Sequence, residues 1–173
     1  MGLNSSPLWG ERNGAAPGDE TPPGHATLPV VAEPAVLPGG NRVLVVDDDV
    51  IDRELTTRCL RKAWPGAKPL VLDSAEGGLE AVRLLRKERY ALLILDWNMP
   101  GHDGAGVIND LLQLEIRIPV VVLSGEWRED IRLDWAQLGA AYLSKNSLTP
   151  ELFRQVIVEV MRTAATSSCS ARR

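Results

Sequence analysis

Short apolar runs that end in a polar side chain are the feature that most constrains the fold of this chain. RVLVV is followed by Asp47, ALLIL by Asp96, VVVL by Ser124, and AAYLS by Lys145. Continuous apolar runs are typical of parallel strands that are covered on both faces. Because the carboxyl ends of parallel strands lie at one edge of a sheet, these four polar groups are expected to converge there.

Helix-like segments alternate with the apolar runs from Arg42 to about Arg162. Since right-handed crossovers place helices on both faces of a sheet, the alternation predicts a doubly wound α/β fold with five parallel strands. Asp49, Ser74 and Thr149 are expected to cap the first, second and last helices, with Pro150 at the first position of the last one. The predicted strands are 42–46, 69–73, 91–96, 118–125 and 140–145, and the helices before the last are 50–64, 77–89, 106–115 and 126–139.

The ends of the chain have a different composition from its centre. Residues 1–40 contain seven Pro and seven Gly and no apolar run that could form a packed face. This composition predicts a disordered arm over residues 1–41, a folded domain over 42–162 and a disordered tail over 163–173.

Charge and cysteine usage narrow the class of partner. The net charge is -4, and Lys and Arg do not cluster, so direct DNA binding is not expected. Cys59 and Cys169 show neither metal-ligand spacing nor a disulfide framework, which favours a reducing, cytoplasmic setting. No segment approaches the length needed to cross a bilayer, so a membrane is not an expected partner.

The run Asp47-Asp48-Asp49 can be explained in two ways. It can be a solvated turn whose last residue caps a helix, which accounts for Asp49. Clustered carboxylates, however, stay ionised only when a cation or hydrogen-bond donors compensate them. Together with Asp96, Asp47 and Asp48 would suit Mg²⁺, which prefers oxygen ligands.

Asp96, Ser124 and Lys145 each allow a structural and a chemical interpretation. Asp96 can simply be exposed at the sheet edge, or its carboxylate can attack phosphorus and form an acyl phosphate. Lys145 can be a solvated strand end, or it can pair with Asp96 and then with a phosphoryl oxygen. Ser124 before a glycine can be an ordinary turn residue. His102 is expected to be an exposed loop residue.

Four segments together resemble the receiver domain of bacterial two-component response regulators, particularly the chemotaxis type: VLVVDDD, LILDWNMPGHDG, VVVLSG and AYLSK. The resemblance implies a flavodoxin-like strand order 2-1-3-4-5. It also implies that Asp96 is the phospho-acceptor and that Mg²⁺ or Mn²⁺ is the cofactor. The implied metal ligands are Asp48, Asp96 and the backbone carbonyl of Asn98, with Asp47 holding a metal-bound water.

The same resemblance implies how a signal enters and leaves. A sensor histidine kinase or phosphotransfer protein would supply the phosphoryl group, and Ser124, Lys145 and Tyr142 would respond to it. Asn98 and Glu126 would modulate hydrolysis of the acyl phosphate. An output protein, or a second copy in a dimer, would bind the fourth helix, fifth strand and fifth helix, about residues 127–162, including Trp127, Trp135 and Tyr142. The chain would be a self-modifying phospho-acceptor and not an enzyme acting on other substrates.

Two positions depart from the usual receiver pattern. Ser124 stands where many receivers have Thr, and the hydroxyl is retained. Asn146 follows Lys145 where most receivers have a cis Pro; because a non-proline cis bond costs about 2.5–4 kcal/mol, a trans bond and a different loop are expected. Only 28 residues follow Lys145, so a stand-alone receiver without an output domain is expected.

Two other functions remain open from the sequence. A haloacid-dehalogenase-type phosphatase would use Asp47 as nucleophile and Asp49 as its second acid, but it also needs acidic metal ligands downstream of Lys145, where Glu151 and Glu159 lie inside a helix. A phosphorylation-independent interaction module on the same fold is the other alternative.

Overall fold

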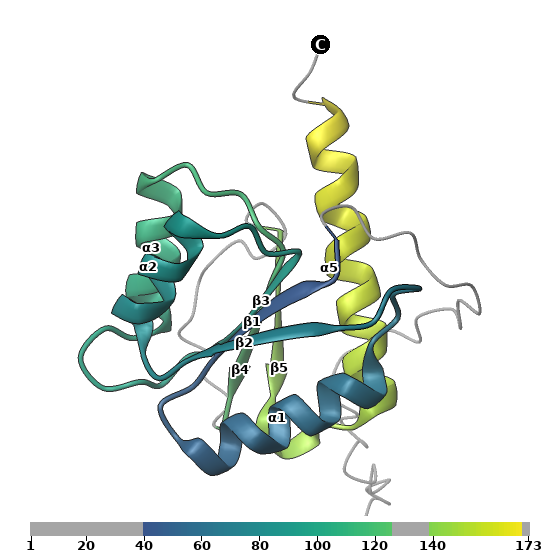
Figure 1. The fold of residues 1–173 in the computed structure, drawn as a ribbon, viewed down its shortest axis with the longest axis horizontal. Helices are drawn as coiled ribbons and strands as arrows, with labels where there is room; N and C mark the ends of the chain where they lie inside the picture. The colour runs from purple at the N-terminus through teal and green to yellow at the C-terminus, as the bar shows by residue number, and fades with distance from the viewer. Residues whose placement is uncertain (1–39, 126–138, 171–173) are drawn as a thin grey trace, which may run out of the picture.

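The computed structural model describes residues 40–125 and 139–170, with side chains up to residue 165. Within them lies a five-stranded parallel sheet of order β2-β1-β3-β4-β5 (Figure 1). The strands are β1 (Arg42–Val46), β2 (Val71–Ala75), β3 (Leu92–Asp96), β4 (Val120–Ser124) and β5 (Ala140–Ser144). The predicted fold class and strand order are confirmed.

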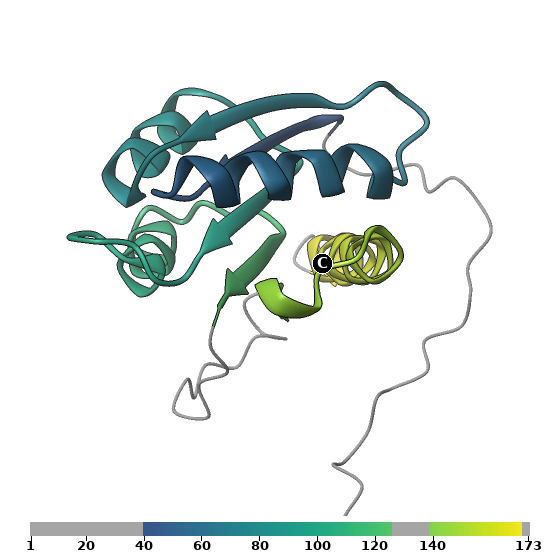
Figure 2. The same cartoon turned by 90° about the horizontal axis from the view of Figure 1, so that it is seen from below.

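Helices cover both faces of the sheet, as predicted (Figure 2). One face carries α1 (Val50–Ala63) and α5 (Pro150–Ser170), and the other carries α2 (Gly78–Lys87) and α3 (Gly104–Gln113). A 3-10 turn, η1 (Lys145–Ser147), joins β5 to α5. The predicted fourth helix falls on residues 126–138, which lie outside the described residues.

Alternating side chains of the central strands fill two separate cores. In β1, Leu44 and Val46 pack into the core under α2 and α3, whereas Val43 and Val45 pack into the core under α1 and α5. All five residues of β3 are buried. This double coverage explains why the central strands are apolar runs and do not alternate with polar residues.

Helix capping follows the sequence at α1 and α5 but not at α2. The Asp49 carboxylate accepts hydrogen bonds from the backbone N–H groups of Ile51 and Asp52, and Thr149 Oγ1 accepts one from Leu152. Ser74 does not cap α2: it lies inside β2, and Gly77 precedes the helix without a side-chain cap. The reason is strand pairing, since Val45 and Val46 of β1 pair with Ser74 and Ala75 and extend β2 past its predicted end.

The C-terminal boundary also differs from the prediction. Helix α5 continues to Ser170, beyond the predicted end at Arg162. The segment after Pro150 contains no further Gly or Pro, the residues that most strongly end a helix. The predicted disordered arm lies almost entirely outside the described residues and stays a prediction. Among the described helices, none is both long and apolar enough to cross a membrane.

Candidate functional site

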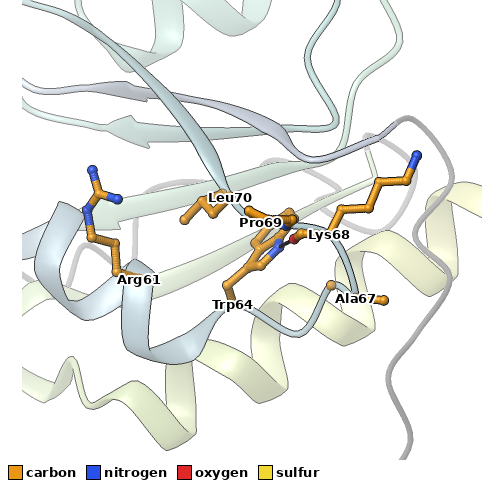
Figure 3. A pocket seen from close by; sticks show the side chains of 7 residues that line it. Arg61, Trp64, Ala67, Lys68, Pro69 and Leu70 are labelled. Atoms are coloured by element: carbon orange, nitrogen blue, oxygen red, sulfur yellow. Dashed lines mark hydrogen bonds between the residues drawn. The ribbon is translucent and has the colours of Figure 1, made fainter.

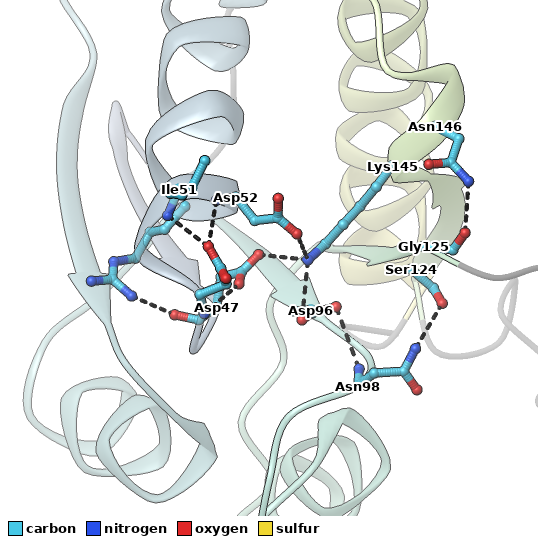
Figure 4. Close-up of polar contacts among 11 residues, drawn as sticks. Asp47, Ile51, Asp52, Asp96, Asn98, Ser124, Gly125, Lys145 and Asn146 are labelled. Carbon is cyan, nitrogen blue, oxygen red and sulfur yellow. Dashed lines mark hydrogen bonds and ion pairs between the residues drawn. The ribbon is translucent and has the colours of Figure 1, made fainter.

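The polar groups that end the strands converge at one edge of the sheet (Figure 4). Asp47 follows β1, Asp96 ends β3, Ser124 ends β4, and Lys145 follows β5. Asp47, Asp96 and Ser124 are only 2%, 5% and 0% exposed. Because burying polar groups costs free energy unless they are paired, these side chains need partners within the cluster.

Lys145 is the centre of that pairing. Its Nζ lies 2.8 Å from Asp47 Oδ2, 2.9 Å from Asp52 Oδ2 and 3.1 Å from Asp96 Oδ2. Burial acts to lower the pKa of Lys145, but the three carboxylates outweigh it and raise the pKa above its ordinary value. Lys145 is therefore a permanent cation at neutral pH.

The environment of the two buried carboxylates, Asp47 and Asp96, disfavours their charged form. Burial raises the pKa of Asp47 and of Asp96, and Lys145 opposes the rise in both without cancelling it. Asp48 adds to the rise at Asp96 because it is a like charge nearby. One ammonium thus compensates the acidic cluster incompletely, and a second cation would stabilise the ionised carboxylates.

Three carboxylates are arranged so that one cation could contact them all. Oxygen atoms of Asp47, Asp48 and Asp96 lie within 4.8 Å of one another. Oxygen-only donors of this kind fit Mg²⁺ or Mn²⁺, and the exposed Asp48 leaves one side of the group open to solvent. Asn98 is adjacent, since its backbone N–H contacts Asp96 Oδ1 at 3.3 Å.

Two asparagines form hydrogen bonds at the carboxyl end of β4. Asn98 Nδ2 donates to Ser124 Oγ at 3.2 Å, which ties the loop after β3 to the end of β4. Asn146 Nδ2 donates to the carbonyl of Gly125 at 2.8 Å (Figure 4). No described peptide bond is cis, so the predicted trans bond between Lys145 and Asn146 is confirmed. The residue that replaces the usual Pro therefore joins the loops after β4 and β5.

Of the remaining predicted site residues, the structure describes only Tyr142. Tyr142 on β5 is half-buried and packs against the core under α2 and α3. Glu126, Trp127 and Trp135 lie outside the described residues, so the roles predicted for them stay predictions.

Sequence reasoning missed one contact of the site and misjudged one loop residue. Asp52 was assigned no place in the site from the sequence, yet its carboxylate pairs with Lys145. Its proximity to Asp47 along the chain was the available signal. His102 was expected to be exposed, but it is half-buried, and its Nε2 lies 2.9 Å from Asp110 Oδ2.

A hollow elsewhere on the surface does not coincide with this chemistry. It has a volume of about 510 Å³ and lies beyond the C-terminal end of α1, lined by residues including Arg61, Trp64 and Lys68 (Figure 3). The polar cluster is instead at the N-terminal end of α1. The hollow and the polar cluster therefore lie at opposite ends of α1.

Comparison with known proteins agrees with this arrangement. The family model of the response regulator receiver domain matches residues 43–157 of the chain. The chain belongs to the response regulator receiver family. This receiver is 34% identical over 131 residues to the transcriptional regulatory protein PrrA of Mycobacterium leprae, covering 75% of this chain and 54% of that protein. It is 34% identical over 109 residues to a protein-glutamate methylesterase/protein-glutamine glutaminase of Treponema denticola, covering 61% of this chain and 28% of that protein.

Solved receiver structures have the same fold. The signal receiver domain of a LuxO repressor protein from Vibrio parahaemolyticus superposes with a TM-score of 0.63 at 20% identity, covering 77% of this chain and 98% of that one. The receiver described here spans about half of PrrA and less of the methylesterase, so what those whole proteins do does not transfer directly.

The phosphatase alternative loses its second acid in the structure. That mechanism requires Asp49 as an acid. In the structure its carboxylate accepts hydrogen bonds from the backbone N–H groups of Ile51 and Asp52 at the start of α1. Family membership and this capping role both favour a receiver.

Proposed function

We propose that this receiver accepts a phosphoryl group on Asp96 from a sensor histidine kinase or phosphotransfer protein. The supporting observation is the environment of Asp96: a carboxylate at the end of a buried strand, 3.1 Å from the Lys145 ammonium and grouped with Asp47 and Asp48. Phosphorylation on aspartate is characteristic of the family. A carboxylate in such a setting can act as a nucleophile when positive charge meets the incoming phosphoryl group.

In this transfer, a carboxylate oxygen of Asp96 forms a bond to phosphorus while the bond between phosphorus and the donor nitrogen breaks. The donor imidazole leaves with the electron pair. Asp48, Asp96 and the carbonyl of Asn98 would hold Mg²⁺ or Mn²⁺, with Asp47 acting through water, and the cation would neutralise charge on the phosphoryl oxygens. Lys145 would pair with one of those oxygens, and Ser124 would donate its hydroxyl to another.

The response to phosphorylation would be a shift between two states of the chain. Ser124 is hydrogen-bonded to Asn98, and the carbonyl of Gly125 to Asn146. A move of Ser124 toward the phosphoryl group would therefore disturb the loops after β3 and β5. Tyr142 would change rotamer, and Asn98 and Glu126 would set the rate of hydrolysis. A partner acts on the signal only when it distinguishes the two states. The proposed surface for it is β5, α5 and the predicted fourth helix, which lies outside the described residues.

The test is incubation of the full chain with acetyl phosphate and Mg²⁺, followed by intact mass spectrometry. We expect the wild type to gain one phosphoryl mass that hydroxylamine removes, as an acyl phosphate requires. Asp96→Asn should gain none. Asp49→Asn is the matched control, since asparagine caps a helix as well as aspartate, and it should be modified like the wild type.

An unmodified wild type, with metal binding established by calorimetry, would refute the proposal and favour the interaction module. Modification that persists in Asp96→Asn would place the phosphoryl group on another residue. A phosphotransfer profile against purified histidine kinases would then identify the donor.

A further inference from the structure

Asp52 brings a carboxylate to Lys145 from outside the strand ends. It lies in the first turn of α1, and its Oδ2 is 2.9 Å from Lys145 Nζ. Its side chain is 44% exposed, whereas those of Asp47 and Asp96 are 3% and 6% exposed. The three carboxylates on Lys145 are therefore not equivalent.

The ammonium of Lys145 is surrounded by three carboxylates in this arrangement. A lysine ammonium carries three N–H donors and no acceptor. Asp47 and Asp52 accept hydrogen bonds from it at 2.8 and 2.9 Å, and Asp96 forms an ion pair with it at 3.1 Å. A phosphoryl oxygen that pairs with Lys145 therefore competes with these carboxylates for the ammonium.

Of the three carboxylates on Lys145, Asp52 can be changed with the least direct effect on the acceptor and the metal ligands of the proposed function. Asp47 and Asp96 belong to the carboxylate group that could surround a cation, whereas Asp52 does not. Asp52 is held in the first turn of α1, because the backbone N–H of Asp52 donates to the Asp49 cap at 3.1 Å. Its negative charge also lies beside the ammonium that an anionic phosphoryl donor must approach.

On the basis of the proposed function, we propose that Asp52 is a positioning residue that restrains Lys145 and slows phosphorylation of Asp96. Two effects act in the same direction: Asp52 competes with the phosphoryl oxygens for an N–H of Lys145, and its charge repels the donor. Because exposed ion pairs are weak, the restraint is a modest brake on the rate and not an on-off switch.

The competing explanation is that Asp52 only stabilises the start of α1. An acidic residue in the first turn interacts favourably with the helix dipole. In that case its removal would lower the thermal stability of the chain and leave the phosphorylation rate unchanged. The phosphorylation rate therefore separates the two explanations, and its dependence on ionic strength tests the contact with Lys145, since salt screens a half-exposed carboxylate.

The experiment compares the initial rate of phosphorylation by acetyl phosphate, at saturating Mg²⁺, in the full-length wild type, Asp52→Asn and Glu54→Gln. Glu54→Gln is the matched control: it removes the same charge from the same helix, but Glu54 pairs with Arg58 at 2.9 Å. At low salt we expect Asp52→Asn to react roughly threefold faster than the wild type, the factor that a weak exposed pair supports. Glu54→Gln should match the wild type.

At about 1 M salt, where the Debye length is about 3 Å, the rates of Asp52→Asn and the wild type should approach each other. Thermal unfolding of each variant establishes that it is folded. An Asp52→Asn rate equal to or below that of the wild type at low salt, or a rate ratio independent of salt, would overturn the role of Asp52 and leave the proposed function intact. If no chain accepts a phosphoryl group, the proposed function fails and this role fails with it.

Discussion

At the scale of single residues, Arg42, Asp73 and Tyr90 form a polar cluster separate from the acidic group of Asp47, Asp48 and Asp96. Arg42 Nε lies 2.6 Å from Asp73 Oδ2, and Tyr90 Oη donates to the same oxygen at 2.8 Å. Burial acts to raise the pKa of Asp73, but Tyr90 and Arg42 together lower it below its ordinary value. Burial and the Asp73 hydrogen bond raise the pKa of Tyr90 to about 12.

The Tyr90 hydroxyl should contribute stability that depends on pH. Tyr90→Phe is expected to lower the free energy of unfolding by about 1.5 kcal/mol at neutral pH, because one hydrogen bond to a charged group is lost while the ring is kept. A tyrosine in the unfolded chain loses its proton near pH 10, whereas folded Tyr90 keeps it to about pH 12. The folded state then binds more protons, so this stability is complete below about pH 10 and is lost as the pH rises from there.

Urea unfolding of the wild type and Tyr90→Phe between pH 7 and pH 11 measures this effect. The difference in unfolding free energy between the two chains should be constant up to about pH 10 and then shrink. A difference that stays constant across the whole range would show that the hydroxyl does not titrate with the raised pKa.

At the scale of elements, the loop after β3 packs between α2 and α3. A Cβ added at Gly78 would lie 2.7 Å from His102 Cδ2 and 2.8 Å from Val107 Cγ2, and it would also meet the His102 backbone carbonyl. A Cβ at Gly106 would lie 2.8 Å from His102 Cε1. These two glycines leave the space that the His102 ring fills, so the loop that begins with Trp97 and Asn98 is packed against both helices.

Gly78→Ala should therefore destabilise the chain although alanine favours a helix. Its added methyl has no room beside the His102 backbone, and overpacking of this kind costs about 1–3 kcal/mol. Gly77→Ala is the matched control, because a Cβ there meets no atom of the described residues within 4 Å. Urea unfolding of both variants measures the difference. Equal stability of the two would mean that the loop moves aside easily.

At the scale of the whole molecule, the acidic cluster should couple metal binding to folding. Asp47, Asp48 and Asp96 repel one another in the folded chain, and a cation that binds them stabilises the folded state alone. At a Mg²⁺ concentration about 100 times its Kd, the gain in unfolding free energy is expected to be about 2.7 kcal/mol.

Asp48→Asn should lose most of that gain, because it removes the most exposed of the three carboxylates. In EDTA the same variant should unfold at or above the urea midpoint of the wild type, since one like charge is gone. Asp49→Asn, which retains the helix cap, should keep the Mg²⁺ response. Urea unfolding with Mg²⁺ and with EDTA provides the comparison, and an undiminished gain in Asp48→Asn would contradict this account of the site.

The sequence alone determined the parallel α/β fold, the strand order implied by the resemblance, and the meeting of Asp47, Asp96, Ser124 and Lys145 at one sheet edge. These follow from local patterns: an apolar run predicts a buried strand, and parallel strands end on the same side. The caps of α1 and α5 were predictable for the same reason, since a cap bonds to residues two or three positions away.

Only the tertiary structure decided which side chains within that edge contact one another. Lys145 meets Asp52 across 93 residues of chain, Asn146 reaches Gly125, and His102 fills the space left by Gly78 and Gly106. Strand pairing likewise moved Ser74 from the predicted cap into β2. Local patterns specify which segments form strands and helices, but partners distant in sequence are set by how those elements pack, because each contact depends on distances that only the folded chain defines.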